Sequence, residues 1–284
     1  MGNYTKENVL KANVELHSQL ADVYNKDEPH WRPENIHNVR GRLQYLKEAI
    51  GAADMLDIGC GTGFMIEVAR PLGFETITGM DITPKMIEQV DVSGSANVGL
   101  ILGDVSNIPR PDCSFDVATA YSFIDHLYDM PAVFEEVNRT LRKGGAFYAG
   151  LIPNEQYWTA INQLDPTQHY SESIDREIRH VSQKDSEINE AYGIDQETFK
   201  IAEYQKNIRG GLSEESLRRQ LLEAGFTKVD FIYDWFLGQR KIILDETLTL
   251  REREARMALM EGLLREQLPI SRSLFKYLSF YAFK

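Results

Sequence analysis

The sequence predicts an α/β fold in which a mostly parallel sheet carries helices on both faces. Three short apolar runs, at 55–58, 76–80 and 98–102, have the length and composition of buried strands. A segment with helical spacing separates the first two, and a short helix beginning at Pro84 precedes the third. Strands that alternate with helices are typical of βαβ units, and 284 residues suffice for one such domain with insertions.

The turn after the first strand is rich in glycine. Gly59, Gly61 and Gly63 allow a sharp turn with no side chain to block a ligand. The helix that begins near Phe64 would present its free N–H groups to whatever binds there. Asp81 ends the second strand, where a carboxylate can accept two hydrogen bonds from a ribose diol. Together these features predict a nucleoside-binding βαβ unit.

The glycine spacing distinguishes between nucleoside classes. The dinucleotide fingerprint requires glycines at its first, third and sixth positions, but this chain has Phe64 at the sixth. The run from Asp57 to Gly63 instead resembles motif I of the class I S-adenosylmethionine (SAM)-dependent methyltransferases, whose pattern Asp-x-Gly-x-Gly-x-Gly it matches in full. Asp81 and Asp104 follow at regular intervals, and the close resemblance covers about residues 54–153.

This resemblance implies a cofactor and the residues that bind it. SAM would be the cofactor and S-adenosylhomocysteine the product. In the family, an acidic residue at the position of Asp104 accepts the exocyclic amine of adenine, and its apolar neighbour packs on the ring. The expected cofactor-binding residues are Asp57, Gly59, Cys60, Gly61, Gly63, Asp81, Ile82, Met86, Gly103, Asp104, Val105, Ala120 and Tyr121.

The resemblance also implies a doubly wound, Rossmann-like sheet of seven strands with the last strand antiparallel. The expected methyltransferase core comprises residues 51–153 and 212–284, and its last strand, 274–283, is expected at the edge of the sheet. A charged helix at about 246–267 lies within a helical insertion at about 245–268. This helix is either part of a cap or the surface of a homodimer.

Residues 1–50 are expected to cover the cofactor and substrate site with two helices, at about 5–25 and 37–50. A loop with two prolines, 24–35, connects them. In an alternative interpretation, Trp31 merely fixes this loop and Arg40 is a solvated helix residue. The candidates to line the substrate pocket are Tyr24, His30, Trp31 and Arg40.

The insertion at 154–211 follows the fifth strand, which is predicted at 146–152. It begins rich in aromatic residues and lies beside the site by topology, so we interpret it as a substrate cap in which Tyr157 and Trp158 contact the acceptor. A helical decoration or an oligomer contact is the alternative.

His126 is the candidate catalytic residue. It follows the fourth strand, predicted at 115–120, and ligands in doubly wound sheets lie outside the carboxyl ends of the strands. A histidine there could take the proton of a substrate hydroxyl or amine, or it could merely cap the next helix. Methyl transfer otherwise needs mainly alignment and exclusion of water. His30 and His169 are weaker candidates for a base.

Composition limits the partners. The formal net charge of −12 disfavours nucleic acid. The sequence lacks an apolar run of about 18 residues, so no membrane span is expected. The amino-terminal residues lack the apolar core of a signal peptide, and we expect a cytoplasmic protein. Two cysteines and scattered histidines predict neither a disulfide framework nor a metal site.

The sequence is therefore interpreted as a SAM-dependent methyltransferase that acts on an O, N or C atom of a small-molecule acceptor. A protein or RNA acceptor stays open within this class. One alternative is an NAD-dependent oxidoreductase, against which Phe64 argues. Another is a catalytically silent SAM-binding partner subunit, against which the intact glycine motif argues.

Overall fold

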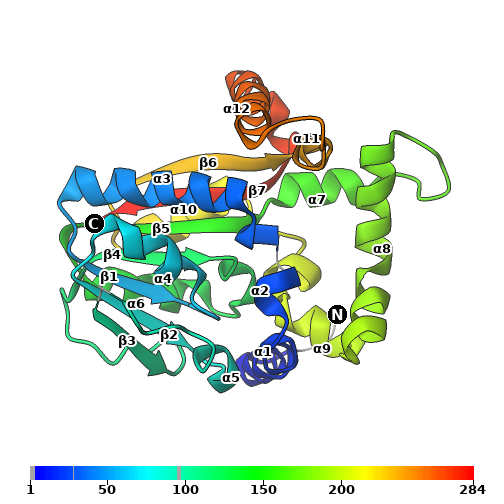
Figure 1. Cartoon of the computed structure of the whole chain (residues 1–284). Coiled ribbons are helices and arrows are strands. Elements are labelled where there is room, and N and C mark those ends of the chain that lie inside the picture. Colours follow the sequence, from blue (N-terminus) through cyan, green and yellow to red (C-terminus); the bar gives the residue numbers. More distant parts are fainter. Residues whose placement is uncertain (1–3, 28, 95–96) are drawn as a thin grey trace.

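The computed structural model describes residues 4–27, 29–94 and 97–284, the side chains at 27 and 182–188 excepted. Residues 1–3, on which the signal-peptide prediction partly rests, lie outside this range. One seven-stranded sheet with helices on both faces forms the centre (Figure 1). Its spatial order is β3-β2-β1-β4-β5-β7-β6. The strands are β1 (Asp54–Ile58), β2 (Thr76–Asp81), β3 (Asn97–Leu102), β4 (Phe115–Tyr121), β5 (Leu141–Pro153), β6 (Lys228–Phe236) and β7 (Phe275–Phe283).

The predicted fold class is confirmed, with one correction. β1 to β5 run parallel to one another, and β7 is antiparallel to both β5 and β6. β7 therefore lies between β5 and β6, and the expectation that residues 274–283 form the sheet edge was wrong. Both faces of β7 are buried, as is typical of a strand inside a sheet: Leu278 and Phe280 pack into the core on one face, and Tyr281 packs into the core on the other. β6 is the edge strand and carries the exposed Lys228 there.

Apolar residues on alternate faces of the strands build two cores. In β1, Met55 packs into the cluster with α3 and α4, whereas its neighbour Leu56 faces the cluster with α6 and α10. β1, β2, β4 and β5 run parallel to one another, so their carboxyl ends lie at the same edge of the sheet. The helices of the core are α4 (Phe64–Ala69), η2 (Arg70–Leu72), α5 (Pro84–Ile87), η3 (Ile124–His126), α6 (Met130–Thr140) and α10 (Glu214–Glu223).

The amino-terminal region forms α1 (Lys6–Leu20), α2 (Tyr24–Asp27), η1 (Pro29–Trp31) and α3 (Pro33–Ile50). α3 crosses one face of the sheet, whereas α1 lies beyond the strand ends, next to α5 and α9 (Figure 1). The first helix is shorter than predicted and the second begins earlier. Pro33 is tolerated at the first helical position because that residue's N–H has no partner inside the helix.

The segment after β5 forms α7 (Glu155–Asn162), α8 (Glu172–Tyr192), α9 (Gln196–Ala202) and the π-helical turn η4 (Tyr204–Ile208). α9 packs on α1, where Phe199 and Ile194 meet Leu16 in a small apolar cluster. The amino-terminal helix and the insertion therefore share one buried contact beside the strand ends.

The segment between β6 and β7 forms α11 (Gln239–Ile243), α12 (Leu250–Glu266) and η5 (Ile270–Leu274). α12 stands out from the edge of the molecule formed by β6 and β7 (Figure 1). None of the helices in the described ranges combines the length and apolar character that crossing a bilayer requires.

Candidate functional site

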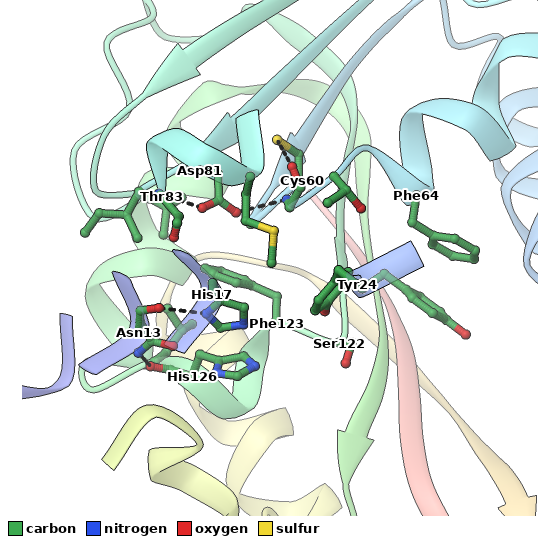
Figure 2. A pocket seen from close by; sticks show the side chains of 18 of the residues that line it. Asn13, His17, Tyr24, Cys60, Phe64, Asp81, Thr83, Ser122, Phe123 and His126 are labelled. Carbon is green, nitrogen blue, oxygen red and sulfur yellow. Dashed lines mark hydrogen bonds between the residues drawn. The ribbon is translucent and has the colours of Figure 1, made fainter. Parts of the chain in front are cut away.

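A cavity lies at the carboxyl ends of β1, β2 and β4, where the sequence places its glycine loop (Figure 2). It encloses about 780 Å³ of empty space, including open solvent at its mouth. α1 and α2, from the amino-terminal part of the chain, also line it. Its lining residues are Leu10, Asn13, His17, Tyr24, His30, Gly59, Cys60, Gly61, Thr62, Phe64, Asp81, Ile82, Thr83, Met86, Gly103, Asp104, Val105, Tyr121, Ser122, Phe123, His126 and Leu127.

The glycine loop adopts a backbone conformation that other residues rarely take. Gly59, Gly61 and Gly63 have φ angles of 63°, 51° and 95°. A Cβ atom at Gly59 would lie 2.0 Å from Cδ2 of Phe123, so a side chain there is excluded. At Gly61 a Cβ atom would meet no described atom within 4 Å, because this residue faces the cavity. The loop thus brings bare backbone to the surface of the cavity.

Asp81 fixes this loop by hydrogen bonds and still has free hydrogen-bond acceptor positions. Its Oδ2 accepts a hydrogen bond from Gly61 N–H at 2.9 Å, and its Oδ1 accepts one from Thr83 N–H at 2.8 Å. An ionised carboxylate has about four acceptor positions, so two remain for a ligand. A diol that donates two hydrogen bonds fits this remaining capacity.

Asp104, after β3, is tied to α1. It forms an ion pair with Lys6 at 2.9 Å and accepts hydrogen bonds from the N–H and Oγ of Ser106. Partial burial opposes ionisation of Asp104, but these hydrogen bonds and the Lys6 charge outweigh it and hold the carboxyl pKa below its usual range. The charged carboxylate can accept a further donor from a ligand in the cavity.

Asp57 and Cys60 support the loop from beneath. Burial, together with the nearby charge of Asp81, raises the pKa of Asp57 to about 7, although a hydrogen bond from Thr119 Oγ1 at 2.7 Å opposes the shift. Burial and the charges of Asp57 and Asp81 raise the pKa of the Cys60 thiol well above its usual value. Cys60 therefore stays a neutral thiol and is no nucleophile at physiological pH.

Two histidines from distant parts of the chain meet in the cavity, and we call His17 and His126 the imidazole pair. Their ring centroids are 4.9 Å apart, with the rings edge to face (Figure 2). Each Nδ1 lies 2.9 Å from a backbone carbonyl, that of Asn13 for His17 and that of Ala202 for His126. A carbonyl only accepts, so Nδ1 carries the proton and Nε2 of a neutral ring has a free lone pair.

The surroundings of His17 favour the neutral form of its ring. Burial and the adjacent His126 lower the pKa of His17 below its usual range, although the charges of Asp81 and Glu203 oppose the shift. Asn13 links the two histidines, because its Nδ2 donates to the carbonyl of His126 at 3.2 Å. His17 thus presents a neutral ring to the cavity.

His30 is buried in an aromatic cluster at the side of the cavity. Its ring centroid lies 4.9 Å from that of Phe64 and 6.0 Å from that of Tyr121. Burial lowers its pKa to about 4. The neutral ring packs well against these aromatic rings, whereas burying the charged ring would cost free energy because the charge would lose its hydration.

Acid is expected to destabilise the protein through His30. Between pH 6.5 and 4 the unfolded chain binds a proton at this residue and the folded chain does not, so stability falls as the pH falls. The loss at pH 4 is at most about 3 kcal/mol. His30→Phe should show a smaller loss in urea unfolding measured at pH 7.5 and pH 4.5, whereas the exposed His169→Phe should match the wild type. An unchanged pH difference in His30→Phe would contradict this account.

The structure brings most of the predicted site residues together. Gly59, Cys60, Gly61, Asp81, Ile82, Met86, Gly103, Asp104, Val105, Tyr121, Tyr24, His30 and His126 all line the cavity. Asp57, Gly63 and Ala120 lie just behind this surface: Asp57 binds Thr119, Gly63 begins α4 against Val90, and Ala120 is in the core.

The structure places four other candidates elsewhere. Trp31 packs edge to face on Phe64 at 5.2 Å and so fixes the loop, and Arg40 also does not line the cavity. Tyr157 and Trp158 are buried in a separate cluster with Ile161, Ile178 and Leu237. They do not line this cavity, because α7 packs its apolar face against Ile178 of α8 and against Leu237.

Several lining residues were missed. Asn13 and His17 lie on the amino-terminal helix, and Thr62 in the loop donates to Asn25 on α2 at 2.5 Å. In α1 the buried positions include a polar one, Asn13, beside Val9, Ala12 and Leu16. A polar residue within an apolar stripe was the available signal. Within the described ranges, no group of three or more His, Cys, Asp or Glu side chains could hold a metal ion.

Comparison with known proteins supports the assignment of this cavity. A family model described as a methyltransferase domain matches residues 56–149. The malonyl-[acyl-carrier protein] O-methyltransferase of Serratia marcescens is 32% identical over 135 residues, which are 46% of this chain and 52% of that protein. An uncharacterised methyltransferase of Bacillus subtilis, YcgJ, is 32% identical over 166 residues, or 55% of this chain and 64% of that protein.

Solved structures share the fold. A SAM-dependent methyltransferase from Archaeoglobus fulgidus superimposes with a TM-score of 0.51 at 18% identity, covering 88% of this chain and 94% of that one. The [4+2]-cyclase SpnF superimposes with a TM-score of 0.56 at 14% identity, covering 97% and 96%.

The matched region contains the glycine loop, Asp81 and His126, and thus the centre of the cavity. The chain spans about half the length of the curated relatives it matches. The motif, the sheet order and the matched domain agree, so residues 56–149 of this chain form a methyltransferase domain of the kind found in class I SAM-dependent methyltransferases.

Proposed function

We propose that this chain transfers the methyl group of SAM to a hydroxyl oxygen of an uncharged small molecule. The observation that carries the proposal is a single cavity in which the glycine loop and Asp81 face the imidazole pair (Figure 2). Bound SAM supplies an electrophilic methyl group on a sulfonium. The residues around the cavity would hold the two reactants and receive one proton.

The residues present fit the cofactor. Asp81 has acceptor positions left for a ribose diol, and the bare backbone at Gly61 allows a close approach. Asp104 and Val105 lie together in the cavity lining, where a carboxylate can accept an exocyclic amine and an aliphatic side chain can pack on a ring. The carboxylates would also favour a cationic sulfonium over an anionic ligand.

His126 would act as the general base. Its Nδ1–H donates to the carbonyl of Ala202, so the lone pair on Nε2 is available to take the acceptor's hydroxyl proton as the new O–C bond forms and the S–C bond breaks. Asp125 is buried, and its Oδ1 lies 3.9 Å from Nε2. That carboxylate would stabilise the imidazolium that results.

The charge of the lining favours an uncharged acceptor. In the parts of the chain that the structure describes, neither Lys nor Arg lines the cavity, and Lys6 nearby is paired with Asp104. An anionic acceptor would meet Asp81 and Asp104 without a counter-charge. A hydroxyl compound instead matches the free lone pairs of the imidazole pair.

The test is to denature the purified protein and identify the released small molecules by mass spectrometry. SAM or S-adenosylhomocysteine would support the cofactor assignment, and NAD would overturn it. If nothing is released, thermal stabilisation by SAM and by NAD is compared, since a ligand at 100 times its dissociation constant stabilises by ~2.7 kcal/mol. Methyl-labelled SAM is then incubated with hydroxyl, amine and carboxylate compounds. Binding of SAM without transfer to any acceptor would favour the silent subunit.

A further inference from the structure

α12 presents an apolar stripe to solvent. Leu259 is 64% exposed and Leu263 is 46% exposed, although both are large aliphatic residues. They are four residues apart and so lie on the same side of the helix. Arg256 and Glu266 extend this stripe at helical spacing, one before Leu259 and one after Leu263, and both are exposed.

The opposite side of α12 fixes the helix firmly to the protein. Met257 is buried, and Leu264 packs against the core of the sheet. Arg253 pairs with Glu34 of α3 at 3.2 Å, and Arg265 donates to the carbonyl of Tyr233 at 2.9 Å. The exposed stripe is therefore not the face of a loosely attached helix, and its orientation relative to the sheet is set.

We propose that this stripe is the contact surface between two copies of the chain, which pair their α12 helices antiparallel about a two-fold axis. Placing Leu259 of one copy opposite Leu263 of the second copy also places Arg256 opposite Glu266. A two-fold contact is self-complementary, so each of these pairings occurs twice. Apolar contacts at the centre are thus flanked by two ion pairs.

The charges select this arrangement over others. A parallel pairing would set Arg256 against Arg256 and Glu266 against Glu266, which repel. Neither residue forms an ion pair inside the part of the chain that the structure describes, so both are available to a second copy. The stripe carries both signs, unlike the basic faces of helices that bind anionic membranes. A second copy is the occupant that satisfies the apolar and the charged positions together.

The experiment is sedimentation velocity of the full chain over a concentration series, with charge-reversed variants. The wild type should approach twice the 32.5 kDa of one chain. Arg256→Glu and Glu266→Arg should each raise the dissociation constant about 100-fold, since each creates two like-charge contacts. Combining the two changes restores opposite charges, and the double variant should regain most of the wild-type affinity.

Arg251→Glu is the matched control, because it reverses an exposed arginine on the same helix away from the stripe. It should leave the dissociation constant unchanged, and thermal melting should show all variants folded. A wild type that stays at the monomer mass at every concentration overturns the proposal. The proposal is also overturned if the wild type dimerises and neither Arg256→Glu nor Glu266→Arg raises the dissociation constant. This result is independent of whether the cavity binds SAM.

Discussion

Replacing Asp81 with Asn should weaken SAM binding about 100-fold, because two charge-assisted hydrogen bonds are worth about 1.5 kcal/mol each. Its two carboxylate oxygens each accept one N–H from the protein, at Gly61 and Thr83. The remaining acceptor positions are those proposed for the ribose diol. An amide in this place removes the charge and turns one acceptor group into a donor that faces another donor. Isothermal titration calorimetry with SAM measures the effect.

Asp91 offers a matched control for Asp81. Its Oδ1 accepts the N–H of Ser93, two residues on, at 2.8 Å, as Asp81 accepts the N–H of Thr83. Asp91 is exposed and does not line the cavity, so Asp91→Asn should bind SAM like the wild type. Equal affinities for SAM in Asp81→Asn and Asp91→Asn would exclude the proposed role of Asp81.

A second comparison separates the diol contact from support of the loop. The wild type should bind adenosine more tightly than 2′,3′-dideoxyadenosine, because the two ribose hydroxyls donate hydrogen bonds to the Asp81 carboxylate. Asp81→Asn should bind the two nucleosides with similar affinity, because one partner of those hydrogen bonds is already changed. If both proteins show the same preference, Asp81 affects binding only by holding the loop.

That the residues at the strand ends line one cavity was largely predictable from the sequence, because the determinants of their position are local. Asp81 ends β2, the glycine loop and Asp104 come shortly after β1 and β3, and parallel strands bring their carboxyl ends to one edge. Residues that contact a ligand at this edge are therefore encoded within a few positions of each strand end. His126 follows β4 in the same way.

The acceptor side depends on packing between distant segments, which local patterns do not encode. His17 reaches His126 because α1 packs on α9, and Leu16 and Phe199 come from segments far apart in the sequence. Aromatic composition alone could not show that Tyr157 and Trp158 turn toward α8 rather than toward the cavity. Helical periodicity identified the buried side of α1 but not which of its polar residues face a ligand.

The position of β7 illustrates the same limit at the level of the sheet. Both faces of β7 are buried, with Leu278 and Phe280 on one face and Ser279 and Tyr281 on the other. This pattern was readable in the sequence as a near-continuous apolar run. Its partner on the outer side, β6, comes from the preceding segment and pairs with it antiparallel, so strand order does not follow chain order.

Replacing His126 with Gln should lower kcat for a hydroxyl acceptor about 100- to 1,000-fold, the usual contribution of a general base. Glutamine can keep a hydrogen bond to the carbonyl of Ala202 but cannot take a proton. The dissociation constant for SAM should change little, because Asp81 and the glycine loop are untouched. Single-turnover kinetics with methyl-labelled SAM separates the chemical step from binding.

His169→Gln is the control for His126→Gln, since this histidine is 84% exposed, pairs with Asp175 and lies outside the cavity lining. It should keep the wild-type rate, and a loss as large as that of His126→Gln would show that the substitutions act through something other than proton transfer in the cavity.

His17→Phe tests the other member of the imidazole pair. Phenylalanine preserves the edge-to-face packing on His126 and removes the ring nitrogens, including the Nδ1 that donates to Asn13. A wild-type rate in His17→Phe would assign His17 to orienting His126 by packing, whereas a loss would show that its lone pair also holds the acceptor.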